Sequence, residues 1–190
     1  MNDDEQLILE EQIIGRTRRT FQLVNYCIAN IAAYRVNWIT IDNKRTLRID
    51  LDFWVRANGT FFDMTVIEWC KLFADKNGKH HWSKTFPNHQ EWTHKLLQHL
   101  EMSEEDYEVE LAKIKDYRDK YVAHLDNPKS MNYPLTEFML VSASHLYDSI
   151  KNSEQTKTHV GTIYDSANAY YLRMMNDYNK EIEVRLNQQH

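Results

Sequence analysis

One short stretch of the sequence combines side chains that could bind and cleave a phosphodiester. Arg118 and Asp119 are followed, after four more residues, by His124. A guanidinium can bind a phosphate through two parallel hydrogen bonds and stabilise the negative charge that grows on it during reaction. Histidine titrates near neutral pH and can act as a general base or a general acid. Together these residue types would suffice for RNA cleavage in which the ribose 2′-hydroxyl is the nucleophile.

The same stretch has the pattern of an amphipathic helix that ends near His124. Its apolar residues repeat every three or four positions, which predicts one buried face, at Tyr107, Leu111, Ile114, Tyr121 and Leu125. Arg118 falls on this face, where a guanidinium is costly unless it is paired or hydrogen-bonded. We therefore expect Arg118 to be either half of a structural ion pair or part of a functional site.

The spacing between Arg118 and His124 limits how the two side chains can meet. On a straight helix it corresponds to about 9 Å of rise and roughly 120° of rotation, so the side chains do not stack on one another. A long Arg118 side chain could bend towards His124. Alternatively, a second copy of the helix could bring a second pair alongside, which would place the site at a two-fold interface.

Arg118-Asp119-x4-His124, with Ala123 before the histidine and Asp126 after it, resembles the R-x4-6-H motif of HEPN domains. The ending is similar to that of the branch found in bacterial abortive-infection proteins, and the segment 69–73 (Trp-Cys-Lys-Leu-Phe) also looks like its counterpart there. The resemblance implies a small helical bundle that dimerises, so that the motifs of two protomers face each other. Active members of the family are metal-independent endoribonucleases, often toxins, and others serve as binding modules.

The resemblance also implies roles for single residues. Arg118 would hold the scissile phosphate, His124 would transfer protons, and Asp119 would orient or polarise the site. Lys120 and Tyr121 lie between them and are candidate contacts to RNA, although for Tyr121 we favour packing at an interface over stacking on a base. Two protomers would supply an acid and a base, without a cofactor or metal. The expected partners are RNA, a second copy, and an antitoxin or regulatory protein.

The main alternative is a non-catalytic, dimeric HEPN-like module that binds nucleic acid or protein. A histidine at a helix C-terminus, such as His124, is favoured by the helix macrodipole and needs no catalytic role. Arg118 could likewise be the structural partner of a glutamate on another helix. Under this hypothesis both residues hold helices together.

Other kinds of site have weaker support. The histidines His89, His94 and His99 recur every five residues, which rotates each ring about 140° from the last, whereas helical zinc sites use intervals of four. We therefore predict no metal site at these three histidines or at the neighbouring His80 and His81. Cys27 and Cys70 match no metal-ligand spacing and are expected to be buried, reduced thiols.

The composition predicts a cytoplasmic protein with one domain, spanning residues 1–190. The chain has a formal net charge of −5, which argues against a surface for general nucleic-acid binding but allows a local basic cleft. Basic residues gather at 16–19, 44–48 and 76–84, where each group is most simply a solvated face. The acidic N-terminus is unlike a signal peptide, and no apolar run is long enough to cross a membrane.

The periodicity predicts an all-α fold, an antiparallel helical bundle of about five main helices. We expect helices over 4–39, 52–74, 104–124, 135–150 and 160–186, with a shorter one over 88–100. Asn88 and Ser103 are expected N-caps, the latter in a capping box with Asp106, and 42–45 is expected to be a turn. Residues 47–55 also alternate like a strand, but we favour the helix because a lone strand would have no partner.

Overall fold

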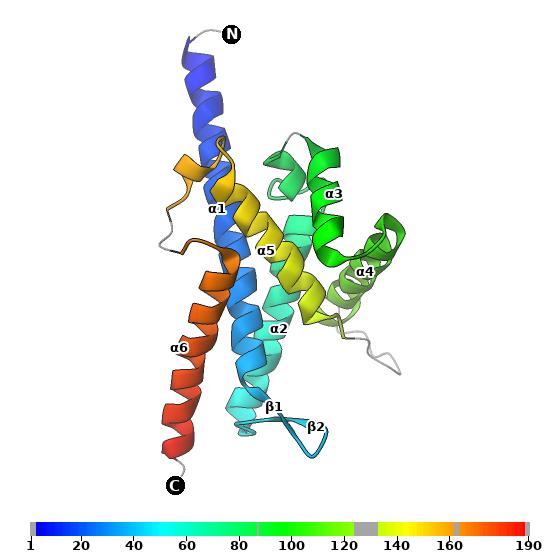
Figure 1. The fold of residues 1–190 in the computed structure, drawn as a ribbon, viewed down its shortest axis with the longest axis vertical. Helices are drawn as coiled ribbons and strands as arrows, with labels where there is room; N and C mark the ends of the chain where they lie inside the picture. The colour runs from blue at the N-terminus through cyan, green and yellow to red at the C-terminus, as the bar shows by residue number, and fades with distance from the viewer. Residues whose placement is uncertain (1–2, 87, 124–132, 162–163, 189–190) are drawn as a thin grey trace.

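The computed structural model describes residues 3–86, 88–123, 133–161 and 164–188. Within these ranges the chain is an all-α helical bundle, as predicted (Figure 1). Its α-helices are α1 (Asp3–Val36), α2 (Asp52–Phe73), α3 (His89–Leu100), α4 (Glu104–Tyr117), α5 (Thr136–Asn152) and α6 (Ala167–Asn187). The shorter elements are strands β1 (Trp38–Ile41) and β2 (Lys44–Leu47), 3₁₀-helices η1 (Trp82–Lys84) and η3 (Lys157–His159), and the π-helix η2 (Arg118–Ala123).

Helices α1 and α2 form the central antiparallel pair (Figure 1). Helix α5 packs across α1, α6 runs along α1, and α3 and α4 lie on the opposite side from α6. The core where these helices meet is apolar, and its fully buried side chains include Val24, Ile28, Ile31, Val66, Trp69, Phe73, Ile114, Met139, Leu146 and Ile150. The indole N–H of Trp69 donates to Ser142 Oγ at 2.7 Å, so this buried polar group is satisfied.

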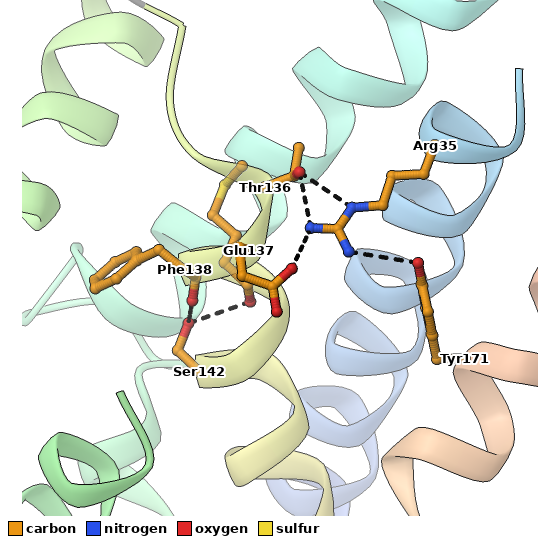
Figure 2. Close-up of polar contacts among 7 residues, drawn as sticks. Arg35, Thr136, Glu137, Phe138, Ser142 and Tyr171 are labelled. Carbon is orange, nitrogen blue, oxygen red and sulfur yellow. Dashed lines mark hydrogen bonds and ion pairs between the residues drawn. The ribbon is translucent and has the colours of Figure 1, made fainter. Parts of the chain in front are cut away.

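Arg35, in the last turn of α1, connects α1 to the first turn of α5 and to α6 (Figure 2). Its guanidinium donates to Thr136 Oγ1 at 2.9 and 3.1 Å, to Glu137 Oε2 at 2.8 Å and to the Tyr171 hydroxyl at 3.4 Å. A cation at the end of α1 and an anion at the start of α5 both complement their helix dipoles. These contacts join the end of α1 to the start of α5 and to α6.

The predicted helix over 52–74 is confirmed, because α2 spans Asp52–Phe73. The prediction that the first helix reaches residue 39 is wrong, since α1 ends at Val36 and residues 38–41 form β1. Strands β1 and β2 pair antiparallel, from Trp38 opposite Leu47 to Ile41 opposite Lys44. Of the alternating segment 47–55, only Leu47 lies in a strand, where it pairs with Trp38, and the segment is helical from Asp52 on.

The hairpin turn explains how these two short strands can pair. Asp42 and Asn43 have φ values of 50° and 61°, as the two central residues of a type I′ turn require. Arg48 then anchors the hairpin to α6, through hydrogen bonds to Asn179 and Glu183. The predicted turn over 42–45 is confirmed at Asp42 and Asn43 only, because Lys44 and Arg45 already belong to β2. The hairpin that this turn makes was not predicted.

The predicted helix caps are confirmed where they can be compared. The side chain of Asn88 accepts from the backbone N–H of Glu91 at 3.3 Å, and Ser103 Oγ accepts from that of Asp106 at 3.1 Å. The predicted start of the last helix at residue 160 is wrong. Helix α6 begins at Ala167, because Ser166 caps it by accepting from Ala169 N–H at 3.2 Å.

The N-terminal turns of α1 extend beyond the neighbouring helices (Figure 1). Leu7, Ile8, Leu9 and Ile13 are exposed there, Leu7 by as much as 58%. Burial along α1 begins at Thr17. Among the helices of the described ranges, none has the length and apolar character needed to cross a membrane.

Candidate active site

The helix that carries the predicted motif changes its winding at Arg118. Helix α4 ends at Tyr117, and the chain continues directly into η2, a π-helix over Arg118–Ala123. In a π-helix each N–H bonds to the carbonyl five residues back instead of four, and such turns are frequent at functional sites. The chain is thus helical up to the residue before His124, as predicted, but its last turn is wider. His124 itself, with Leu125 and Asp126, lies outside the described residues.

Arg118 lies between two carboxylates. Its Nη1 is 2.8 Å from Oδ1 of Asp75, and its Nε is 2.8 Å from Oδ1 of Asp119. The Arg118 side chain is 20% exposed, compared with 38% for Asp75 and 48% for Asp119. Because Asp75 follows the C-cap of α2, its ion pair with Arg118 joins η2 to the end of α2. One of our two expectations for Arg118, a structural ion pair, is therefore present.

The surroundings of Arg118 favour its charged form. Partial burial lowers the pKa of the guanidinium, but the hydrogen bonds to Asp75 and Asp119 outweigh this effect and raise the pKa above its usual value. Arg118 therefore keeps its positive charge throughout the physiological pH range. The two carboxylates hold the guanidinium plane in a defined orientation, because an N–H of Arg118 points at each of them.

The two other candidate residues of the motif also have contacts within the chain. Lys120 Nζ lies 2.9 Å from Asp116 Oδ1, one helical turn back. Tyr121 is half-buried, packs against the hydrophobic core, and lies 5.2 Å from Tyr117 between ring centroids. These contacts of Tyr121 lie within its own chain, so the interface packing that we favoured over base stacking stays a prediction. An RNA contact by either residue stays a prediction.

An aromatic group next to Arg118 was not predicted from the sequence. Tyr117 donates to Asp63 Oδ1 at 3.0 Å, and its ring lies 5.4 Å from Phe62 and 5.8 Å from Tyr133. Tyr133 is 62% exposed, so an aromatic face is available to solvent beside the motif. Such faces can stack with unpaired bases. Tyr133 lies 15 residues along the chain from Arg118, and no local pattern connects the two.

The cysteine nearest the motif is not suited to nucleophilic chemistry. Burial raises the pKa of Cys70 to about 12. The positive charge of Arg118 opposes this effect, and the negative charge of Asp75 reinforces it. Burial likewise raises the pKa of Cys27 well above its usual value. Both cysteines are buried free thiols, which confirms their predicted burial. Since the thiolate is the reactive form, neither residue is a candidate nucleophile.

His81 and His89 make structural hydrogen bonds. His81 is buried, with Nε2 3.0 Å from the Phe73 carbonyl and Nδ1 accepting from Ser83 N–H at 3.3 Å. His89 Nε2 lies 2.9 Å from the Ser83 carbonyl. Within the described ranges, His, Cys, Asp and Glu side chains form no group of three or more that could hold a metal ion.

Asp75 is the residue of this site that sequence reasoning missed. We anticipated a glutamate on another helix as the structural partner of Arg118, and the partner is an aspartate 43 positions earlier in the chain. Asp75 stands in a polar stretch with ordinary loop composition, so no signal in the sequence connects it to Arg118. Only the packing of α4 and η2 against α2 brings the two together.

The chain matches no protein-family model, no curated protein and no solved structure.

Proposed function

We propose that this protein is a metal-independent endoribonuclease of a defence or toxin–antitoxin type system, with a composite active site at a homodimer interface. Arg118 and His124 of each protomer would form that site. The main support is the position of Arg118, a charged guanidinium held by Asp75 and Asp119 in the wide helical turn that directly precedes His124. The resemblance of the motif to HEPN domains supplies the reaction type.

In this proposal Arg118 binds the scissile phosphate. A guanidinium has five N–H donors in a fixed fork, and the bonds to Asp75 and Asp119 engage Nη1 and Nε. A phosphate would approach from the Nη2 side, where it could accept hydrogen bonds and gain the stabilisation of its developing charge. Asp119 would act as a positioning residue for Arg118. Asp75, absent from our sequence-based prediction, would share that role.

His124 would transfer the protons of the reaction. The 2′-hydroxyl oxygen attacks phosphorus, and its proton passes to the neutral His124 of one protomer. The bond from phosphorus to the 5′-oxygen breaks, and the protonated His124 of the other protomer gives its proton to that oxygen. The products are a 2′,3′-cyclic phosphate and a 5′-hydroxyl. Each histidine needs a pKa near neutrality to serve in these steps.

RNA and a second copy of the chain are the partners that this mechanism requires. An antitoxin or other regulatory protein would be a third, and the cytoplasm is the proposed location. A homodimer would have twice the 22.8 kDa mass of the chain, which light scattering coupled to size-exclusion chromatography resolves directly. A strictly monomeric protein at micromolar concentration that still cleaves RNA would exclude the composite site.

The second candidate function is a non-catalytic dimeric binding module. It is favoured by the ion pair between Arg118 and Asp75, which joins η2 to α2 and is a sufficient structural reason for an arginine at this position. Under this proposal Arg118 and His124 stabilise the helices that bind RNA or protein.

The deciding experiment is cleavage of mixed cellular and transfer RNA by the purified protein in excess EDTA. We expect products with 2′,3′-cyclic phosphate ends, and at least a roughly hundredfold loss of rate in Arg118→Ala and in His124→Ala. Arg56→Ala is the matched control, because Arg56 pairs with Asp52 in an exposed i,i+4 bridge on α2. Its rate should equal that of the unmodified protein.

Two other outcomes would redirect the assignment. Cleavage that survives both substitutions would place the active site elsewhere. A folded, dimeric protein that cleaves no RNA would favour the binding module. Thermal unfolding adds an independent criterion, since a purely catalytic His124→Ala should leave stability nearly unchanged, whereas loss of a structural contact should cost about 1–3 kcal/mol.

A further inference from the structure

Four cationic side chains gather at the end of the central helix pair, around His80. Arg16 and Arg19 lie one turn apart on α1, Lys71 lies in the last turn of α2, and Lys79 precedes His80 in the following loop. Their convergence is reflected in the pKa of His80, which is lowered first by partial burial and then by positive charges on Lys79, Arg19, Lys71 and Arg16. We refer to these four cations as the basic cluster.

Among the residues that the structure describes, the cations of the basic cluster form no ion pair with a carboxylate. Most other lysines and arginines in the described part of the chain form ion pairs. No described carboxylate lies within ion-pair distance of any of the four, and Arg19 donates only to the neutral Gln22 Oε1, at 2.8 Å. In a chain with a net charge of −5, four unpaired cations in one place leave a local positive potential.

Buried polar atoms without hydrogen-bond partners lie in the same region. Thr20 Oγ1, Glu68 Oε2 and His80 Nδ1 are buried and have no partner among the described residues. Thr20 directly follows Arg19 and is fully buried, and Glu68 is 5% exposed. Leaving such atoms unsatisfied is unfavourable, because they lose their hydrogen bonds to water on burial. Glu68 and His80 thus add polar atoms to the positively charged region around the end of α2.

Glu68 is an acidic side chain close enough to the basic cluster to be affected by Lys71 and Arg19. Burial raises the pKa of Glu68 to about 7, although the positive charges of Lys71 and Arg19 act in the opposite direction. Near neutral pH the Glu68 carboxyl is thus partly protonated, which reduces the negative charge that it places beside the four cations. In its protonated form it is also a hydrogen-bond donor.

We propose that the basic cluster formed by Arg16, Arg19, Lys71 and Lys79 binds phosphate groups of an anionic ligand. Arginine binds phosphate oxygens through its planar fork, and lysine acts as a mobile point charge. The ring of His80, which lies among these cations, adds a further polar group. The phosphate could belong to a single-stranded nucleic acid or to a free phosphorylated small molecule, because both present the same chemistry.

This site is distinct from the one at Arg118. Lys71 belongs to the last turn of α2, and Asp75, the partner of Arg118, follows one turn later. The two sites therefore adjoin, but share none of their cations. Phosphate binding at the basic cluster does not depend on cleavage at Arg118, because binding can be measured with a strand that cannot be cleaved.

The test is binding of a fluorescein-labelled, fully 2′-O-methylated oligouridine of about 20 nucleotides, followed by anisotropy across a series of salt concentrations. Each phosphate contact contributes about 0.7 to the slope of log affinity against log salt for a single strand. Lys71→Gln/Lys79→Gln should therefore weaken binding at least about tenfold near 50 mM salt and reduce the slope by about 1.4.

The matched control is Lys44→Gln/Lys180→Gln, which makes the same chemical change at two exposed lysines on β2 and α6. Its affinity should stay within about twofold of the unmodified protein if binding is local and not a response to net charge. Equal losses of affinity in the two double variants would overturn the proposal. So would a lack of binding to the unmodified protein by both the oligonucleotide and inorganic pyrophosphate, the second probe.

Inorganic pyrophosphate, titrated by calorimetry, separates the two sources of phosphate. Binding of pyrophosphate as tight as that of the oligonucleotide, and lost in Lys71→Gln/Lys79→Gln, would assign the cluster to a small phosphorylated molecule. Much tighter binding of the strand would assign it to a nucleic-acid backbone. Arg118→Ala should retain strand binding in either case, so failure of the ribonuclease proposal and failure of this one give different results.

Discussion

Two groups of charge adjoin at the C-terminal end of α2, and they differ in how their cations are balanced. At the first, Arg118 contacts the carboxylates of Asp75 and Asp119. At the second, the four cations of the basic cluster form no ion pair with a described carboxylate, and buried polar atoms beside them lack partners. The first arrangement fixes the orientation of a side chain. The second leaves charge available for a ligand.

The difference separates two uses of positive charge in an acidic protein. A paired guanidinium is held in place, so it can present a defined set of donors, but part of its field is cancelled by the carboxylates. Unpaired cations attract anions from a distance and lose this effect as salt rises. A nucleic-acid enzyme needs both properties, one for positioning the reacting phosphate and one for retaining the strand.

The largest effect on stability is expected for Asp75→Ala. The substitution leaves the partly buried guanidinium of Arg118 without its contact to α2, and should lower the free energy of unfolding by about 1–3 kcal/mol. Urea denaturation measures it. Asp52→Ala, which removes an exposed i,i+4 partner of Arg56, is the control and should cost about 0.5 kcal/mol or less. Equal losses would mean that the Arg118 pair is no more structural than a surface bridge.

A second prediction concerns the pH dependence contributed by Glu68. Burial raises the pKa of Glu68 from 4.5 to about 7, so the folded state holds its proton more tightly than the unfolded state. The stability contributed by this proton is complete below about pH 4.5 and is lost as pH rises through about 7. Glu68→Gln cannot ionise, and should be more stable than the unmodified protein by about 1–2 kcal/mol at pH 8.

At pH 5 the same Glu68→Gln variant should differ little from the unmodified protein, because Glu68 is then neutral in the folded state. Thermal unfolding across this pH range gives both values. A variant that is less stable at pH 8 would indicate that the ionised Glu68 is held by the cations of the basic cluster, which would weaken the contrast between the two sites.

A third prediction uses His80 as a reporter of the basic cluster. The pKa of His80 is lowered by burial and by four neighbouring cations, so removing two of them in Lys71→Gln/Lys79→Gln should raise it. Binding of pyrophosphate should raise it too, by adding negative charge. The chemical shift of the His80 ring protons against pH measures both. An unchanged pKa in the variant would show that these lysines do not act on the ring.

The smallest effect is expected for Lys120→Gln in η2. Lys120 forms an i,i+4 ion pair with Asp116, in which both side chains are about half exposed. Such pairs contribute about 0.5 kcal/mol or less, so chemical denaturation should detect almost no change. A loss comparable to that of Asp75→Ala would indicate that the whole π-helix depends on its charges, and not on Arg118 alone.

Local signals in the sequence predicted most of the helices. Ser103 and Asn88 stand immediately before apolar repeats of helical period and were identified as caps for that reason. The hairpin was missed because the helical stripe of α1 was extended through Trp38, although the β-branched residues that follow favour a strand. Asp42 and Asn43 are residue types that tolerate the positive φ that the hairpin turn requires, and the structure shows both at positive φ.

The site was less predictable than the fold. The position of Arg118 on an apolar face indicated correctly that it would need a partner, but the contact with Asp75 depends on how two helices pack, and no sequence pattern specifies that. The π-helical winding of η2 has no residue signature either, because it arises from a local shift of hydrogen bonds. Tyr133 beside Tyr117 is another contact of the same long-range kind.

The projecting start of α1 implies that the two ends of this helix open locally at different rates. Isolated helical turns are marginal in water, and their amides exchange with solvent through fraying, whereas turns buried in a core open only with the molecule. Amide hydrogens before Thr17, where burial begins, should thus exchange orders of magnitude faster than those near Val24 and Ile28. Deuterium uptake along α1 would rise towards its N-terminus. The residue at which protection from exchange begins would mark where the cooperatively folded part of the molecule starts.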